Sequence, residues 1–169
     1  MKSFEKVILT NLFFREDYIR KTMPFLKEEF FQDPSEKIIF NEIKDYIETY
    51  NKPPSTEAVE ISLSNSSKLT ESQFKDISEY IVNIKNDDDN DLEWLIDETE
   101  KFCKDKAIYN AILESIHIID GKSKTQTRNS IPVILTDALA VSFDTSVGHD
   151  YIEDADERYD FYHRVETKV

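Results

Sequence analysis

The sequence predicts an all-α fold, and two observations lead to this fold class. Glycine is very scarce, since the 169-residue chain contains only two. Leucine, isoleucine, glutamate and lysine recur at the three-to-four spacing of helix faces. We expect a compact bundle of short helices over residues 1–86, a long helical hairpin over 92–143 and a C-terminal linker helix within 144–169. The bundle and the hairpin together would form one domain, and 144–169 would be a linker segment.

The bundle begins with two short apolar stripes. Their residues are Phe4, Val7, Ile8 and Leu12 in the first, and Tyr18, Ile19, Met23 and Leu26 in the second. Pro24 stops the second segment, because proline lacks the N–H that a helix interior needs. We therefore expect two short helices in succession.

A stronger start signal opens the third helix. Asp33 can cap it, Pro34 suits its first turn, and Glu36 occupies its third position. The helix would end before the breaker at 51–54, which contains two consecutive prolines. The residues expected to face inward are Ile38, Ile39, Ile43, Tyr46, Ile47 and Tyr50.

Two further capped helices complete the predicted bundle. Ser55 would cap the first of them, and Thr70 with Gln73 forms a capping box for the second. The apolar residues of these helices are Val59, Ile61 and Leu63, followed by Phe74, Ile77, Tyr80, Ile81 and Ile84.

The run NDDDND at 86–91 is rich in carboxylates but does not match a calcium loop. An EF-hand loop needs glycine at its sixth position and glutamate at its twelfth, and Asp91 and Asp97 stand there. We interpret the run as a solvated loop whose last aspartates cap the next helix.

The predicted hairpin carries more apolar residues than one partner helix can cover. Its first helix, 92–119, is apolar around most of its circumference in its second half, and Ser130 would cap a second helix ending near Phe143. The surplus must be covered by the bundle or by another copy of the protein, and the sequence leaves both alternatives open. The hairpin residues predicted to form an oligomer interface are Ile108, Ile112, Ile116, Ile134, Leu135 and Leu139.

No catalytic, cofactor-binding or metal-binding residues can be assembled from the sequence. Gly121-Lys122-Ser123 resembles the end of a P-loop, but Ile116 stands where the motif needs its first glycine, and a helix precedes it instead of a strand. The histidines have no ligand spacing with one another or with the single cysteine, Cys103, which we expect to pack between Trp94, Phe102 and Tyr109. We therefore expect no enzymatic activity in this chain.

The overall charge argues against direct binding of nucleic acid. With 35 acidic and 21 basic residues the net charge is -14, which repels phosphate backbones. A small basic tip of Lys122, Lys124 and Arg128 is the exception, and we interpret it as a solvated turn. The N-terminal run FEKVILTNLFFRED is too short and too charged for a signal peptide or a membrane span, so we expect a soluble, intracellular protein.

A last amphipathic segment lies near the C-terminus. Its apolar stripe consists of Ile152, Ala155, Tyr159 and Tyr162, and we predict that this stripe docks on a partner surface. A short helix of this kind is marginal alone in water, which is why it needs such a surface.

Several stretches resemble the replicative helicases of the DnaB family. VILTNLFFREDYIRKTMPFLKEEFF and IIFNEIKDYIETYNKPPSTEAVEISL are similar to the opening of the N-terminal domain of that family. ETEKFCKDKAIYNAILESI, ALAVSFDTSVGHD and DERYDFYHR are similar to the replicative helicases of T-even phages. The resemblance covers nearly the whole chain, and VSFDTSVGHD is its most specific part.

The resemblance implies a helicase N-terminal domain that organises a ring and presents surfaces to primase and to a helicase loader. The chain would self-associate as a dimer, a trimer of dimers and a hexamer in the parent protein, within the cytoplasm of an infected host. Mg-ATP would bind only in the ATPase domain, which this chain lacks, and single-stranded DNA would be held only by the parent ring. The linker helix would dock on the ATPase domain of a neighbouring subunit. The alternative is an independent acidic all-α adaptor or nucleic-acid mimic.

Overall fold

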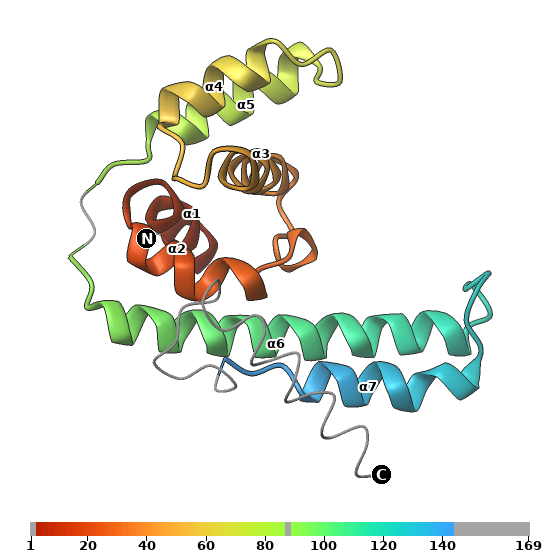
Figure 1. Cartoon of the computed structure of the whole chain (residues 1–169). Helices are drawn as coiled ribbons and strands as arrows, with labels where there is room; N and C mark the ends of the chain where they lie inside the picture. The colour runs from red at the N-terminus through yellow and green to blue at the C-terminus, as the bar shows by residue number, and fades with distance from the viewer. Residues whose placement is uncertain (1–2, 87–88, 144–169) are drawn as a thin grey trace. The chain divides into compact units, whose positions relative to one another are not determined.

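A computed structural model describes residues 3–86 and 89–143 of the chain. These residues form helices joined by turns, with no strand among them, so the predicted all-α fold class is confirmed. The α-helices are α1 (Phe4–Phe14), α2 (Glu16–Thr22), α3 (Pro34–Tyr50), α4 (Thr56–Ser64), α5 (Glu71–Val82), α6 (Leu92–Ile119) and α7 (Ile131–Leu139) (Figure 1). Three short 3₁₀ helices are η1 (Met23–Phe25), η2 (Glu28–Phe30) and η3 (Arg128–Ser130).

The chain divides into two compact units, the first ending at Ile96 and the second beginning at Asp97. The boundary therefore falls inside α6, whose first residues belong to the first unit. The predicted separation of 144–169 as a linker remains a prediction, because that segment lies outside the described residues.

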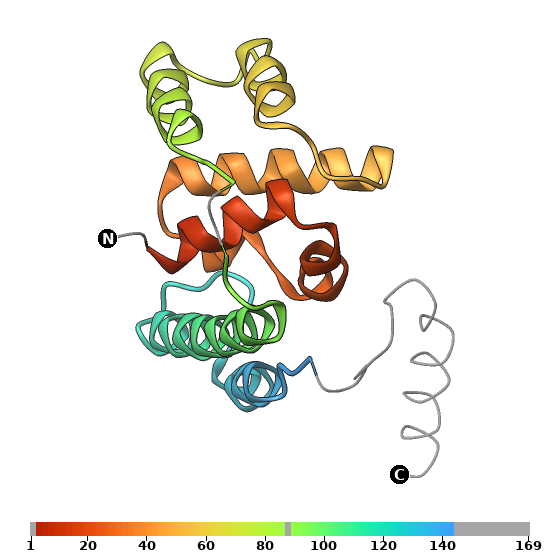
Figure 2. The ribbon, with the colours of Figure 1, turned by 90° about the vertical axis from the view of Figure 1, so that its left-hand side faces the viewer.

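In the first unit α3 is the central helix. The pair α4 and α5 packs along one side of α3, and α1 packs on the other (Figures 1 and 2). The fully buried side chains between these helices include Ile8, Leu12, Tyr18, Phe31, Ile39, Phe40, Ile43, Val59 and Ile77. The rings of Phe31 and Phe40 stack with their centroids 4.9 Å apart.

The predicted helix caps in this unit are confirmed. The Asp33 carboxylate accepts hydrogen bonds from the backbone N–H groups of Ser35 and Glu36 at 2.7 and 3.4 Å. Ser55 accepts from the N–H of Ala58, and Thr70 and Gln73 close their capping box in both directions. Local side-chain chemistry therefore fixes where α3, α4 and α5 begin.

One residue predicted to face inward on α3 does not, and one of the apolar residues of α4 is exposed. Tyr50 is 60% exposed, because it is the last residue of α3 and Asn51 then turns the chain away in the left-handed region (φ 55°). Ile61 is 62% exposed, because it lies about 200° around α4 from the buried Val59 and Leu63.

The second unit consists of most of α6 together with η3 and α7, which lie side by side as an antiparallel hairpin (Figures 1 and 2). The bounds predicted for the first helix, 92–119, are confirmed. Asp91 caps it by accepting a hydrogen bond of 3.1 Å from the N–H of Trp94.

Three predictions about this unit need correction. The Ser130 side chain accepts no capping hydrogen bond at the start of the second hairpin helix, because η3 runs directly into α7. The helix ends at Leu139 rather than near Phe143. Cys103 is buried as predicted, but Trp94 and Tyr109 remain about half exposed. They cannot enclose Cys103, since they lie about half a turn and a third of a turn away from it around the same helix.

Candidate functional site

The exposed surface of α6 carries a stripe of large apolar side chains. Tyr109, Ile112, Leu113 and Ile116 are between 46% and 50% exposed and lie within about 100° of one another around the helix. We call these four residues the hairpin stripe. Solvated helix faces are normally polar, so an apolar face of this length is a candidate association surface.

The opposite side of α6 is closed. Ala111, Ser115 and Ile118 are buried there, and the Ser115 hydroxyl donates a 2.7 Å hydrogen bond to the carbonyl of Ala111. This bond satisfies the only polar side chain of the three within its own helix. The helix therefore has two mainly apolar sides. One is buried, and the other, the hairpin stripe, is exposed to solvent.

The structure separates the six predicted interface residues into two groups. Ile112 and Ile116 belong to the hairpin stripe, and Leu139 on α7 is 71% exposed. The three others, Ile108, Ile134 and Leu135, are partly buried within the monomer.

Sequence reasoning left several exposed apolar side chains out of the interface. These are Tyr109 and Leu113 in the stripe, Ile119 at the end of α6 and Val133 on α7. The signal was present for the first two, because Tyr109, Ile112, Leu113 and Ile116 follow the spacing of a single helix face.

The turn after α6 is a helix C-cap. Gly121 has φ of +74°, its N–H donates to the carbonyl of Ile118, and the N–H of Lys122 donates to the carbonyl of His117, both at 3.0 Å. This pair of bonds is the Schellman motif, in which glycine supplies the left-handed residue. The glycine and lysine that resemble a P-loop are thus used to end a helix.

The basic tip projects from this turn. Lys122, Lys124 and Arg128 are all exposed, and no ion pair involving them is found in the parts of the chain that the structure describes. Metal-binding groups of His, Cys, Asp and Glu are likewise not found among residues 3–86 and 89–143. The linker residues Ile152, Ala155, Tyr159 and Tyr162 lie outside the described residues.

None of the described helices combines the length and the apolar character that a membrane span requires.

The chain thus combines a helical bundle with a helical hairpin that carries an open apolar stripe. Residues 1–90 match the family described as "DnaB-like helicase N terminal domain", and the chain belongs to this family. The chain is also 33% identical, over 172 residues, to a "DnaB-like replicative helicase" of Enterobacteria phage T4. That alignment covers 97% of this chain and 36% of the relative, so the chain spans about a third of the length of the relative that it matches.

Proposed function

We propose that this chain is the N-terminal assembly and docking domain of a hexameric phage replicative DNA helicase. The match to the helicase N-terminal family and the similarity to a phage replicative helicase support the class of protein. The hairpin stripe carries the proposal of assembly, because it offers an open apolar surface on a helix that is already closed on its other side.

Energetics favour pairing of two hairpin stripes. Burying a large apolar side chain fully is worth about 1.5 to 3 kcal/mol. The four stripe residues are about half exposed. Pairing two stripes therefore buries the exposed part of eight side chains, and each contributes a part of this free energy. The total is comparable with the several kcal/mol that association costs. DnaB-family helicases act as oligomers, which agrees with this use of the stripe.

The remaining parts of the proposal concern partners. The ring would form as a trimer of dimers and present surfaces to primase and to a helicase loader, in the cytoplasm of the infected host. An ATPase domain would bind Mg-ATP, and the assembled ring would bind single-stranded DNA. The stripe Ile152, Ala155, Tyr159 and Tyr162 would dock on the ATPase domain of a neighbouring subunit.

The adaptor alternative rests on the net charge of -14 alone. A gene that continues past the codon of Val169 into a strand and a G-x-x-x-x-G-K-[ST] motif would reject it. The match to a helicase family already favours the assembly domain.

Sedimentation equilibrium on designed variants tests the proposal. Ile112→Asp with Ile116→Asp places two carboxylates on the hairpin stripe and should convert oligomers to monomers. Ile61→Asp with Val82→Asp is the matched control, because those side chains are 62% and 68% exposed and lie on the bundle. Circular dichroism must first show that both variants keep the helix content of the natural chain.

The control should associate like the natural chain, and so should Tyr159→Ser with Tyr162→Ser in the linker segment. Loss of oligomers in the linker variant, with retention in the folded hairpin variant, would mean that the association surface lies on the linker.

A further inference from the structure

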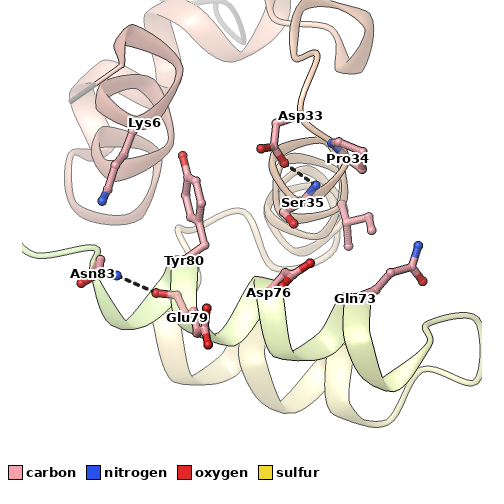
Figure 3. Close-up of a pocket in the computed structure, with 10 residues that line it drawn as sticks. Lys6, Asp33, Pro34, Ser35, Gln73, Asp76, Glu79, Tyr80 and Asn83 are labelled. Carbon is pink, nitrogen blue, oxygen red and sulfur yellow. Dashed lines mark hydrogen bonds between the residues drawn. The ribbon is translucent and has the colours of Figure 1, made fainter. Parts of the chain in front are cut away.

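A polar groove opens on the first unit between α1, α3 and α5 (Figure 3). Its volume is about 590 Å³, which lies within the range of about 300 to 1,000 Å³ that is usual for sites that hold small ligands. Lys6 comes from α1, the start of α3 supplies Asp33, Pro34, Ser35 and Ile38, and α5 supplies Gln73, Asp76, Glu79, Tyr80 and Asn83.

The charges of this groove are mostly negative. Asp33, Asp76 and Glu79 line it against the single cation of Lys6, whose ammonium lies 5.6 Å from the centre of the Tyr80 ring. Asp76 and Glu79 are exposed, are one turn apart on α5, and appear in no ion pair recorded for the described residues. The groove therefore suits the cationic end of a long side chain.

The basic tip has the complementary character. Lys122 and Lys124 flank Ser123 in the turn after the Schellman motif, and Arg128 opens η3. All three cations are exposed on a chain whose net charge is -14, so the tip is attracted to the acidic surface of a second copy of this chain.

Symmetry requires a second interface on each chain if the proposed function holds. Two hairpin stripes that pack on each other form an isologous contact, which is satisfied at two copies. A ring of three such pairs needs a second interface on each chain, formed by residues outside the stripe.

We propose that the basic tip of one copy docks in the acidic groove of another copy and provides this second interface. Lys122 and Lys124 contact Asp76 and Glu79 across it. The inference rests on the proposed assembly function and adds to it the surfaces that join one dimer to the next. Exposed ion pairs are individually weak, so the contact depends on salt and acts on chains that the stripe has already paired.

Charge reversal tests the contact. The tip variant is Lys122→Glu with Lys124→Glu, the groove variant is Asp76→Lys with Glu79→Lys, and the double variant carries all four changes and keeps the natural net charge. Lys52→Glu with Lys68→Glu, at two exposed lysines of the first unit, reproduces the charge change of the tip variant elsewhere. Sedimentation velocity at low salt gives the species that each chain forms.

The natural chain and the lysine control should form species larger than dimers. The tip variant and the groove variant should each lose those species and retain dimers, while the double variant and an equimolar mixture of the two single variants should regain them. Retention of large species by both single variants, or a natural chain that stops at dimers, would overturn the proposal. The stripe variant Ile112→Asp with Ile116→Asp tests the dimers separately, so a failure of the stripe proposal can be told from a failure of the tip-and-groove contact.

Nucleic acid is the competing occupant of the tip. Two outcomes would assign the tip to a phosphate backbone and reject the groove as its receptor. In the first, nuclease removes the large species. In the second, only the tip variant loses them and the double variant does not regain them.

Discussion

The Tyr80 hydroxyl donates a 2.7 Å hydrogen bond to the carboxylate of Glu36, which joins α5 to the first turn of α3. Glu36 is only 7% exposed. A buried carboxylate is costly unless it is hydrogen-bonded, so this bond allows an acid to be buried at the start of α3. The sequence suggested a helix-capping role for Glu36, and the structure adds a tertiary contact to it.

Replacing Tyr80 by phenylalanine should destabilise the chain. The variant loses a hydrogen bond to a charged group, and we expect the free energy of unfolding to fall by about 1 to 3 kcal/mol. Urea denaturation followed by circular dichroism measures the change. Tyr50→Phe is the control, because Tyr50 is 60% exposed, and it should change the free energy little. Equal effects of the two variants would show that the Tyr80 bond contributes nothing specific.

The same bond predicts a dependence of stability on alkaline pH. Burial, and then the hydrogen bond and negative charge of Glu36, raise the pKa of Tyr80 above its ordinary value of 10.0. A raised pKa in the folded state means that the stabilisation is complete below the pKa of the unfolded chain and is lost as the pH rises above about 10. Between pH 9 and 11 the unfolding free energy of the natural chain should therefore fall more steeply than that of Tyr80→Phe. Parallel curves would contradict the assignment.

Removing the cap of α3 should cost stability locally. Asp33→Ala leaves the N–H groups of Ser35 and Glu36 without their side-chain acceptor, which typically costs about 0.5 to 2 kcal/mol. Asp45→Ala makes the same change of charge at an exposed position in the same helix and should cost less. Thermal denaturation of both variants compares them, and a larger effect of Asp45→Ala would be inconsistent with a capping role for Asp33.

Gly121 should tolerate asparagine better than alanine. A Cβ at this position would meet no atom within 4 Å, so the cost arises from the left-handed backbone alone and should reach about 1 to 2 kcal/mol for alanine. Asparagine adopts this conformation more readily and should cost less. Amide hydrogen exchange near the end of α6 measures both. An equal cost for the two residues would argue against the Schellman cap.

Helix bounds could be predicted wherever local chemistry decides them. Asp33, Ser55, Thr70 and Asp91 each accept the backbone hydrogen bond that their position in the sequence predicted. The start of α7 at Ile131 agrees with the prediction, but it follows from η3 rather than from the side-chain bond expected of Ser130. A 3₁₀ turn depends on backbone geometry that leaves little trace in residue type.

Burial was harder to predict, because it depends on which side of each helix meets a neighbour. Tyr50 was predicted to face inward on periodicity alone, and the structure exposes it. The hairpin stripe shows the same difficulty for exposed residues. Ile108 was predicted to lie in the interface and its neighbour Tyr109 was not, yet only Tyr109 belongs to the exposed side of α6.

The central claim is that the hairpin stripe is an interface between copies of this chain, and isoleucine methyl NMR tests it most directly without a mutation. Ile112 and Ile116 are 46% and 50% exposed on the hairpin, and Ile61 is 62% exposed on the bundle. With a soluble paramagnetic probe, all three methyl groups should show strong relaxation enhancement at low protein concentration. At high concentration we predict that Ile112 and Ile116 lose most of this enhancement while Ile61 keeps it. Unchanged enhancement at Ile112 and Ile116 in a sample that sedimentation shows to be oligomeric would contradict the account.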